Sequence, residues 1–146
     1  MKVERVKNID SLPEKIEKKI RQRKKEAHLD IYLYENRLYI SASLGQKKKA
    51  GYEINIREIK KKVMGEWEIM IYKKEPKKGE VVAQVINYPI SIIKIDLDPW
   101  NCLPQRVIFK DKTGEVIKKM KLKEEVNDKY KNTYDQIAHF YLKKFQ

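Results

Sequence analysis

Hydrophobic residues between positions 31 and 43 occur at every second position, and Glu35-Asn36 interrupts this alternation near its middle. A period of two is typical of a β-strand with one buried face, and a short polar interruption between two such segments favours a tight turn. The pattern therefore predicts a β-hairpin made of residues 31–34 and 38–43.

Further strands are predicted downstream of this hairpin. Alternation at 52–57 and 66–72 gives two of them, with 57–64 as a charged connection. The apolar runs 81–86 and 90–97 give two more, and Ile93 and Ile95 are expected to be fully buried because the second run is too apolar for a strand with one wet face. Residues 105–110 and 115–122 flank Asp111-Lys112-Thr113-Gly114, which is typical of a hairpin turn.

Helical spacing is found at the two ends of the chain. Ser11 and Pro13 precede apolar positions at Ile16 and Ile20, which predicts a helix over 13–27 whose two isoleucines contact the rest of the domain. A longer stripe repeats at three- and four-residue steps and predicts a second helix over 124–145. That helix either packs on the sheet or forms the seam of a homodimer.

These elements predict one α+β domain spanning 1–146. Its centre is a mainly antiparallel β-sheet or sandwich of about seven strands over 31–122, flanked by an N-terminal and a C-terminal helix. A chain of 146 residues is long enough to bury a core without disulfide or metal staples.

Charge and cysteine content narrow the functional class. The net charge is +13, which raises nucleic acid as a partner, but it is carried by 28 Lys and only 6 Arg and is spread along the whole chain. This composition is also typical of the solvated surface of thermophile proteins. With a single cysteine, Cys102, and no apolar run of signal-peptide or membrane-span length, a cytoplasmic protein without membrane attachment is expected.

Catalytic signatures are not found in the sequence. His28 and His139 are predicted to lie on the surfaces of the two terminal helices, without a cysteine or carboxylate at metal-ligand spacing. Cys102 has no general base near it in the sequence, which favours a structural thiol. We therefore expect no enzyme activity, no metal and no cofactor.

The segment from Leu38 to Ile95 resembles the PrcB-type domain, the C-terminal domain of a family named for a subunit of a bacterial extracellular protease complex. The resemblance is carried by Tyr39-Ile40-Ser41-Ala42-Ser43-Leu44-Gly45, by Gly51-Tyr52-Glu53-Ile54, and by Val81-Val82-Ala83-Gln84-Val85-Ile86-Asn87-Tyr88-Pro89. Where the family tends to have a Thr-Gly-Gly-Tyr loop, this chain reads Lys49-Ala50-Gly51-Tyr52. The loop with its Gly-Tyr pair is also similar to the loops of chagasin-like cysteine-protease inhibitors. Both resemblances imply a protein partner, and a protease in particular.

The predicted binding site is the loop between the second and third strands, together with aromatic residues around it. Mobile loops and aromatic side chains are favoured contact material. Its candidate residues are Gly45, Lys47, Lys48, Lys49, Gly51, Tyr52 and Trp100. Tyr32, Tyr34 and Tyr39 join them if they face outward, but the alternative that these tyrosines pack under the helices is favoured. The predicted function is a non-catalytic protein-binding module that assembles with or modulates a protease. A Lys-rich nucleic-acid-binding protein is the alternative, and a small-molecule pocket between sheet and helix is a third possibility.

Overall fold

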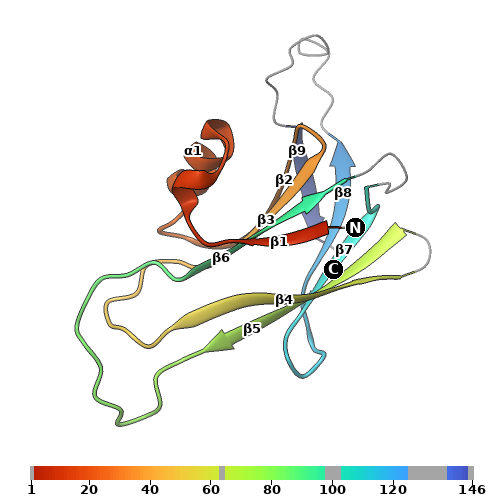
Figure 1. Ribbon diagram of the computed structural model, residues 1–146. Coiled ribbons are helices and arrows are strands. Elements are labelled where there is room, and N and C mark those ends of the chain that lie inside the picture. The colour runs from red at the N-terminus through yellow and green to blue at the C-terminus, as the bar shows by residue number, and fades with distance from the viewer. Residues whose placement is uncertain (1, 63–64, 98–102, 125–137, 145–146) are drawn as a thin grey trace.

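The computed structural model describes residues 2–62, 65–97, 103–124 and 138–144, and within these ranges the protein is mainly β (Figure 1). Two four-stranded sheets are present. The first has the strand order β1 (Lys2–Val6), β6 (Ile90–Asp96), β3 (Arg37–Leu44), β2 (Ala27–Tyr34). The second has the strand order β8 (Val116–Glu124), β7 (Arg106–Lys110), β5 (Glu66–Lys74), β4 (Glu53–Lys61). Strand β9 (Ala138–Lys144) pairs with both β2 and β8 and so connects the two sheets.

The predicted hairpin is confirmed as β2 and β3, which pair antiparallel from Ala27↔Leu44 to Tyr34↔Arg37. Its two turn residues, Glu35 and Asn36, have positive φ angles of 48° and 59°. Two consecutive residues with positive φ define the type of turn whose twist matches that of the strands beside it. The other described pairings are also antiparallel, except for the parallel pair β5 and β7.

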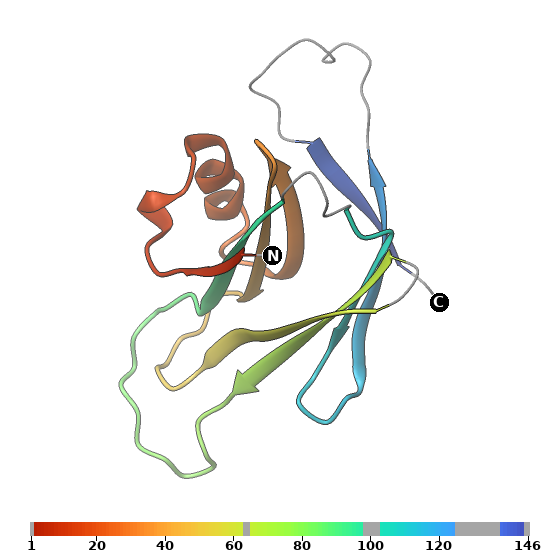
Figure 2. The ribbon, with the colours of Figure 1, turned by 45° about the vertical axis from the view of Figure 1, so that its right-hand side comes forward.

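The main core lies between the two sheets, which face each other in Figure 2. Ile93 and Ile95 are 4% and 0% exposed, which confirms the burial expected for the 90–97 run. From the second sheet, Trp67 and Phe109 are buried in the same cluster. The sheets also meet directly at one side, where the backbone N–H of Ile56 donates to Ser91 Oγ at 3.1 Å.

Strand β4 continues to Lys61, so the prediction of a charged connection from Arg57 onward is wrong for residues 57–61. A register shift between Ile56 and Glu58 is the reason, because it places an extra residue, Arg57, in the strand. Such a β-bulge shifts the alternation by one position. Ile56 and Ile59 therefore pair with Ile71 and Ile69 although they are three residues apart, and the period of two is broken without the strand ending.

The N-terminal helix α1 is Glu14–Gln22, shorter than the predicted 13–27. Its isoleucines Ile16 and Ile20 are both 0% exposed and pack against Tyr32 and Tyr39. Figure 1 shows α1 on the outer face of the first sheet. The next positions at helical spacing after Ile20 are Arg23 and Lys24, so a longer helix would bury no further apolar side chain there, and Ala27 instead begins β2. Strand β1, which was not predicted, pairs with β6 at the edge of the first sheet.

Two other predicted elements are not found. Residues 81–86, expected as a strand, have no regular secondary structure and lie in the connection between β5 and β6. The helix predicted over 124–145 is contradicted where the chain is described, because β8 includes Glu124 and residues 138–144 are strand β9, while 125–137 lie outside the described residues. The homodimer seam expected on that helix therefore has no described helix to form it, and α+β is corrected to a mainly β fold with one short helix.

Candidate functional site

The candidate loop pairs with a second loop, and together they extend from one end of the molecule (Figure 1). We call residues 45–52, between β3 and β4, and residues 75–89, between β5 and β6, the paired loops. Lys47 and Asn87 form an antiparallel bridge with two backbone hydrogen bonds of 2.9 Å each. Ala50 N–H donates to the carbonyl oxygen of Ala83 at 2.9 Å, and Asn87 Nδ2 donates to that of Lys49 at 2.9 Å.

Both glycines of the predicted site are at positions where backbone conformation and space require glycine. Gly51 has a φ of +99°, and a Cβ there would lie 2.8 Å from Cγ of Pro76 in the second loop. Gly45 has a φ of +78°, and a Cβ there would lie 2.8 Å from the backbone nitrogen of Ala27. An L side chain would be strained at either position. Gly51 thus permits the close contact between the paired loops, and Gly45 permits the contact of the first loop with β2.

The three lysines of the loop differ in exposure. Lys48 is exposed, whereas Lys47 and Lys49 are half-buried. The ammonium of Lys47 lies 4.8 Å from the ring centre of Tyr52, a cation–π distance that brings two predicted site residues together. Lys24 makes a similar contact with Tyr88 of the second loop at 4.6 Å. The loop is therefore held to its neighbours, and of its three lysines Lys48 is the exposed one.

The second loop exposes aliphatic side chains that the sequence analysis had assigned to a strand. Val81 is 98% exposed, and Val85 and Ile86 are 49% and 58% exposed. The signal in the sequence was a mostly apolar segment, 81–86, which contains Gln84 but no alternation and lies between Gly79 and Pro89. Because such a run resembles a buried strand, only the structure shows that its hydrophobic side chains face solvent.

The predicted aromatic part of the site is largely not confirmed. Tyr32 and Tyr39 are 2% and 1% exposed beneath α1, so the alternative that these tyrosines pack under a helix is confirmed for both. Burial, followed by the neighbouring carboxylate of Asp30, raises the pKa of Tyr32 well above its ordinary value. Trp100 and Cys102 lie outside the described residues. Tyr52 is the aromatic residue of the predicted site that the structure places at the paired loops.

His28 belongs to a buried network and not, as predicted, to a helix surface. Its Nδ1 lies 3.1 Å from the carbonyl oxygen of Arg23 and 3.0 Å from that of Glu26, so Nδ1 carries a proton because carbonyls only accept. Its Nε2 lies 3.0 Å from Ser41 Oγ. Ser41 is 0% exposed, so the serine side of this pair is closed off from solvent. The pair instead fixes the chain between α1 and β2 to the sheet.

In the described ranges no group of three or more His, Cys, Asp and Glu side chains is placed to hold a metal ion. Among the described helical residues, no helix has the length and apolar character needed to cross a bilayer.

This geometry defines a class of protein: a mainly β protein in which two loops, joined to each other by hydrogen bonds, extend from one end. Residues 38–96, about two fifths of the chain, match the family described as PrcB C-terminal, so the chain contains a PrcB C-terminal domain over those residues. That range includes β3, β4, β5, β6 and both of the paired loops. No curated protein and no solved structure matches the chain.

Proposed function

We propose that the protein is a non-catalytic binding module whose paired loops dock onto another protein. The observation that supports this most is the exposure of Val81, Val85 and Ile86 together on one loop. Monomeric proteins seldom leave neighbouring hydrophobic side chains in water, and such exposure marks interaction sites. The hydrogen bonds between the loops support the same proposal, because they hold the surface in one conformation, and a preorganised surface loses less entropy when it binds.

The chemistry of the paired loops favours a protein partner with an apolar groove and an acidic rim. Lys48, Lys77 and Lys78 are exposed on the same paired loops that expose the three aliphatic side chains. Carboxylates around a groove complement these cations and steer the approach of the partner. Nucleic acid is less well matched, since valine and isoleucine side chains offer neither stacking nor hydrogen bonds to bases.

A protease, or a subunit of a protease complex, is the class of partner that we infer from the resemblance to PrcB-type domains. Within this proposal the module positions or modulates the protease and performs no chemistry itself. The short basic segment Lys47-Lys48-Lys49 gives this chain a charge that would select for an acidic partner surface.

The proposal is tested with the variant Val81→Ser/Val85→Ser/Ile86→Ser and the matched control Val3→Ser/Val116→Ser, which changes two valines that are 44% and 42% exposed and lie outside the paired loops. Each is used as bait in cross-linking capture from cell extract, and each captured protein is then purified and titrated against all three forms. We expect saturable binding to the parent and the control, and at least tenfold weaker binding to the loop variant. Equal affinities for the parent and loop variant would overturn the proposal, as would tighter binding of duplex DNA or RNA than of any protein at physiological salt.

Whether the partner is a protease is tested in a separate experiment. Peptide-hydrolysis assays on the purified partner, with and without the module, show whether the partner is a protease and whether its rate changes. A partner without protease activity, and absent from any protease complex, would overturn this part alone.

A further inference from the structure

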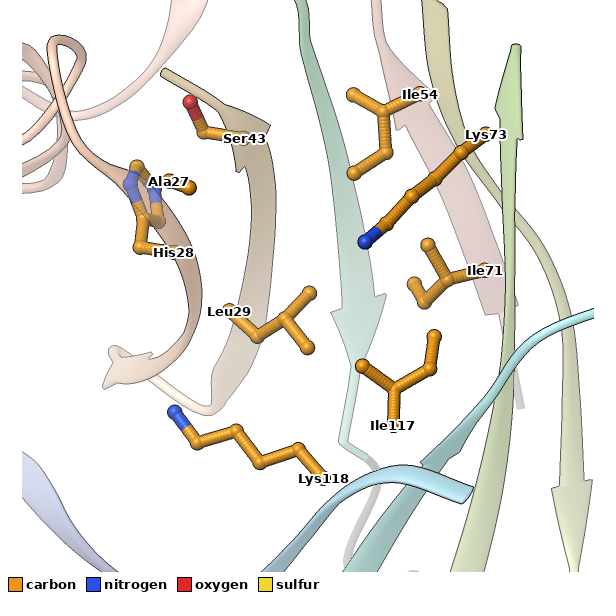
Figure 3. Close-up of a pocket in the computed structure, with 9 residues that line it drawn as sticks. All are labelled: Ala27, His28, Leu29, Ser43, Ile54, Ile71, Lys73, Ile117 and Lys118. Atoms are coloured by element: carbon orange, nitrogen blue, oxygen red, sulfur yellow. The ribbon is translucent and has the colours of Figure 1, made fainter. Parts of the chain in front are cut away.

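A cavity of about 300 Å³ lies at the end of the sandwich from which the paired loops extend. It is formed where β2, β4 and β8 begin and where β3 and β5 end, and we call it the mouth cavity (Figure 3). None of its lining residues belongs to the paired loops. It is therefore a separate site from the docking surface proposed above. Its volume lies at the lower limit for sites that bind small molecules.

The walls of the mouth cavity are mostly aliphatic. Leu29, Ile54, Ile71 and Ile117 come from four different strands and point toward one another in Figure 3. Ile117 is 38% exposed, although the opposite wall at Ile71 is 1% exposed. The hydrophobic core thus continues to the surface here and ends in side chains that a ligand would cover.

Both charged side chains of the cavity are lysines. Lys73 on β5 and Lys118 on β8 line it, and no Asp or Glu does. Figure 3 shows the Lys73 side chain directed across the opening near Ile54 and Ile71. Among the described residues, Lys73 takes part in no salt bridge that balances its charge. An apolar cavity with cations alone at its entrance complements an anion that has an aliphatic tail.

The topology explains why the sandwich is open at this point. Strand β9 pairs with β2 only at Tyr32 and Leu33, and with β8 only from Met120 to Glu124. The beginnings of β2 and β8 extend past these pairings, and in the described part of the chain no strand lies between them. The gap between the two sheets is therefore closed at one end by β9 and open at the other, where the cavity lies.

We propose that the mouth cavity binds a small aliphatic carboxylate, with its chain between the two sheets and its carboxylate beside Lys73 and Lys118. Each water-sized group occupies about 30 Å³, so a cavity of about 300 Å³ holds on the order of ten non-hydrogen atoms. A carboxylate of eight carbons has this size. Mouths of β-barrels and related open sandwiches are common places for such ligands.

Octanoate is the probe that tests this assignment, in calorimetric titration and in amide chemical-shift mapping of the full chain. Saturable binding is expected, with shifts concentrated at the beginnings of β2 and β8. From hexanoate to octanoate, affinity should rise about fourfold per added methylene, and it should level off for longer chains that no longer fit. Octanol, which has no charge, should bind more weakly. Absence of saturable octanoate binding at millimolar concentration would overturn the proposal.

Matched variants locate the binding. Lys73→Gln is expected to weaken octanoate by up to about fivefold, whereas Lys74→Gln, which removes the same charge from the next residue, should have no effect. Ile117→Ser should weaken it at least about fourfold, and Val116→Ser should not, because Val116 does not line the cavity. Equal effects of a variant and its control would mean that binding is diffuse, and the assignment would be wrong.

An extended peptide is the other occupant that the open gap admits, along the beginnings of β2 and β8, which in the described part of the chain pair with no strand on the side of the gap. An acidic hexapeptide containing valine and leucine is therefore titrated in parallel, and shifts at β2 and β8 with this peptide but not with octanoate would replace the proposed ligand. The variant Lys47→Ser/Lys48→Ser/Lys49→Ser should bind octanoate like the parent. Because that variant alters only the paired loops, failure of one proposal is distinguishable from failure of the other.

Discussion

Lys47 and Asn87, forty residues apart in the sequence, pair through two backbone hydrogen bonds of 2.9 Å. The bridge joins loops that leave the ends of two different strands, β3 and β5. Asn87 strengthens it by donating from Nδ2 to the carbonyl oxygens of Lys49 and Val85 at 2.9 and 3.0 Å. The two loops are thus a single structural unit, and a change at their contact should affect both.

Gly51→Ala should destabilise the paired loops. The alanine Cβ would lie 2.8 Å from Pro76 Cγ at a φ of +99°, so both steric overlap and backbone strain oppose it. We expect a loss of about 1 to 3 kcal/mol in the free energy of unfolding, measured by urea denaturation, and weaker binding of the partner.

Gly79→Ala is the matched control for this prediction. Gly79 lies in the same loop with a φ of +83°, but a Cβ there meets nothing within 4 Å. It should therefore show backbone strain alone and a smaller loss than Gly51→Ala. Equal losses at the two positions would show that the contact with Pro76 does not matter.

Replacing Lys47, Lys48 and Lys49 by serine should leave the free energy of unfolding within about 0.5 kcal/mol of the parent, as for most surface changes. The backbone bridge to Asn87 does not need these side chains, and the contact of Lys47 with Tyr52 is a partly exposed one. The same variant should bind the partner more weakly because the charge beside the aliphatic side chains is reduced. Thermal denaturation and titration measure the two effects, and an unfolded variant would mean that the lysines are structural.

Much of the β-sheet was predictable because a strand with one buried face has apolar and polar residues at alternating positions. The β2–β3 hairpin and the buried run of β6 follow from alternation and from a continuous apolar run. The alternation fails where the backbone pairing is irregular, as at the β-bulge formed by Arg57 in β4. A bulge depends on pairing with β5, which local sequence does not reveal.

The C-terminal segment and the binding site show two further limits. Apolar residues from 126 to 145 repeat at helical steps, but Ala138, Phe140 and Leu142 also alternate with His139, Tyr141 and Lys143, and pairing with β8 selects the strand. At the site, Gly51 and Tyr52 were identified from their types and spacing. The exposed aliphatic residues of 81–86 were not, because exposure depends on the surrounding chain and not on the run itself.

Ile93→Ala should cost about 2 to 5 kcal/mol, the range for truncating a buried isoleucine. Ile93 is 4% exposed in the core between the sheets, where the cavity cannot be filled without moving both of them. Urea denaturation measures the loss. Lys94→Ala, on the same strand but outside this core, should cost less, and a loss below about 1 kcal/mol at Ile93 would contradict its placement.

Glu68→Gln should reduce the dependence of stability on acidic pH. Glu68 accepts a hydrogen bond of 2.7 Å from Lys110 Nζ across the parallel pair of β5 and β7. This bond lowers the pKa of Glu68 below its ordinary value of 4.5, and the positive charges of Lys110, Lys62 and Lys60 act in the same direction. Burial of Glu68 opposes the shift but is the weaker effect. A lowered pKa in the folded state means that the stabilising effect is fully present above about pH 4.5 and is lost as pH falls through the lowered pKa.

The glutamine variant cannot form the ionic contact, so it should be less stable than the parent at pH 7 and the difference should shrink below pH 4.5. Urea denaturation at several pH values between 7 and 3 measures it. Glu53→Gln, which removes the same charge from an exposed position on β4, should run parallel to the parent over this range. If the Glu68→Gln and parent curves are also parallel, the bond to Lys110 does not contribute to folding stability. The contact between β5 and β7 then rests on their backbone pairing, on the packing of Trp67 and Phe109, and on the ion pair between Arg106 and Glu66.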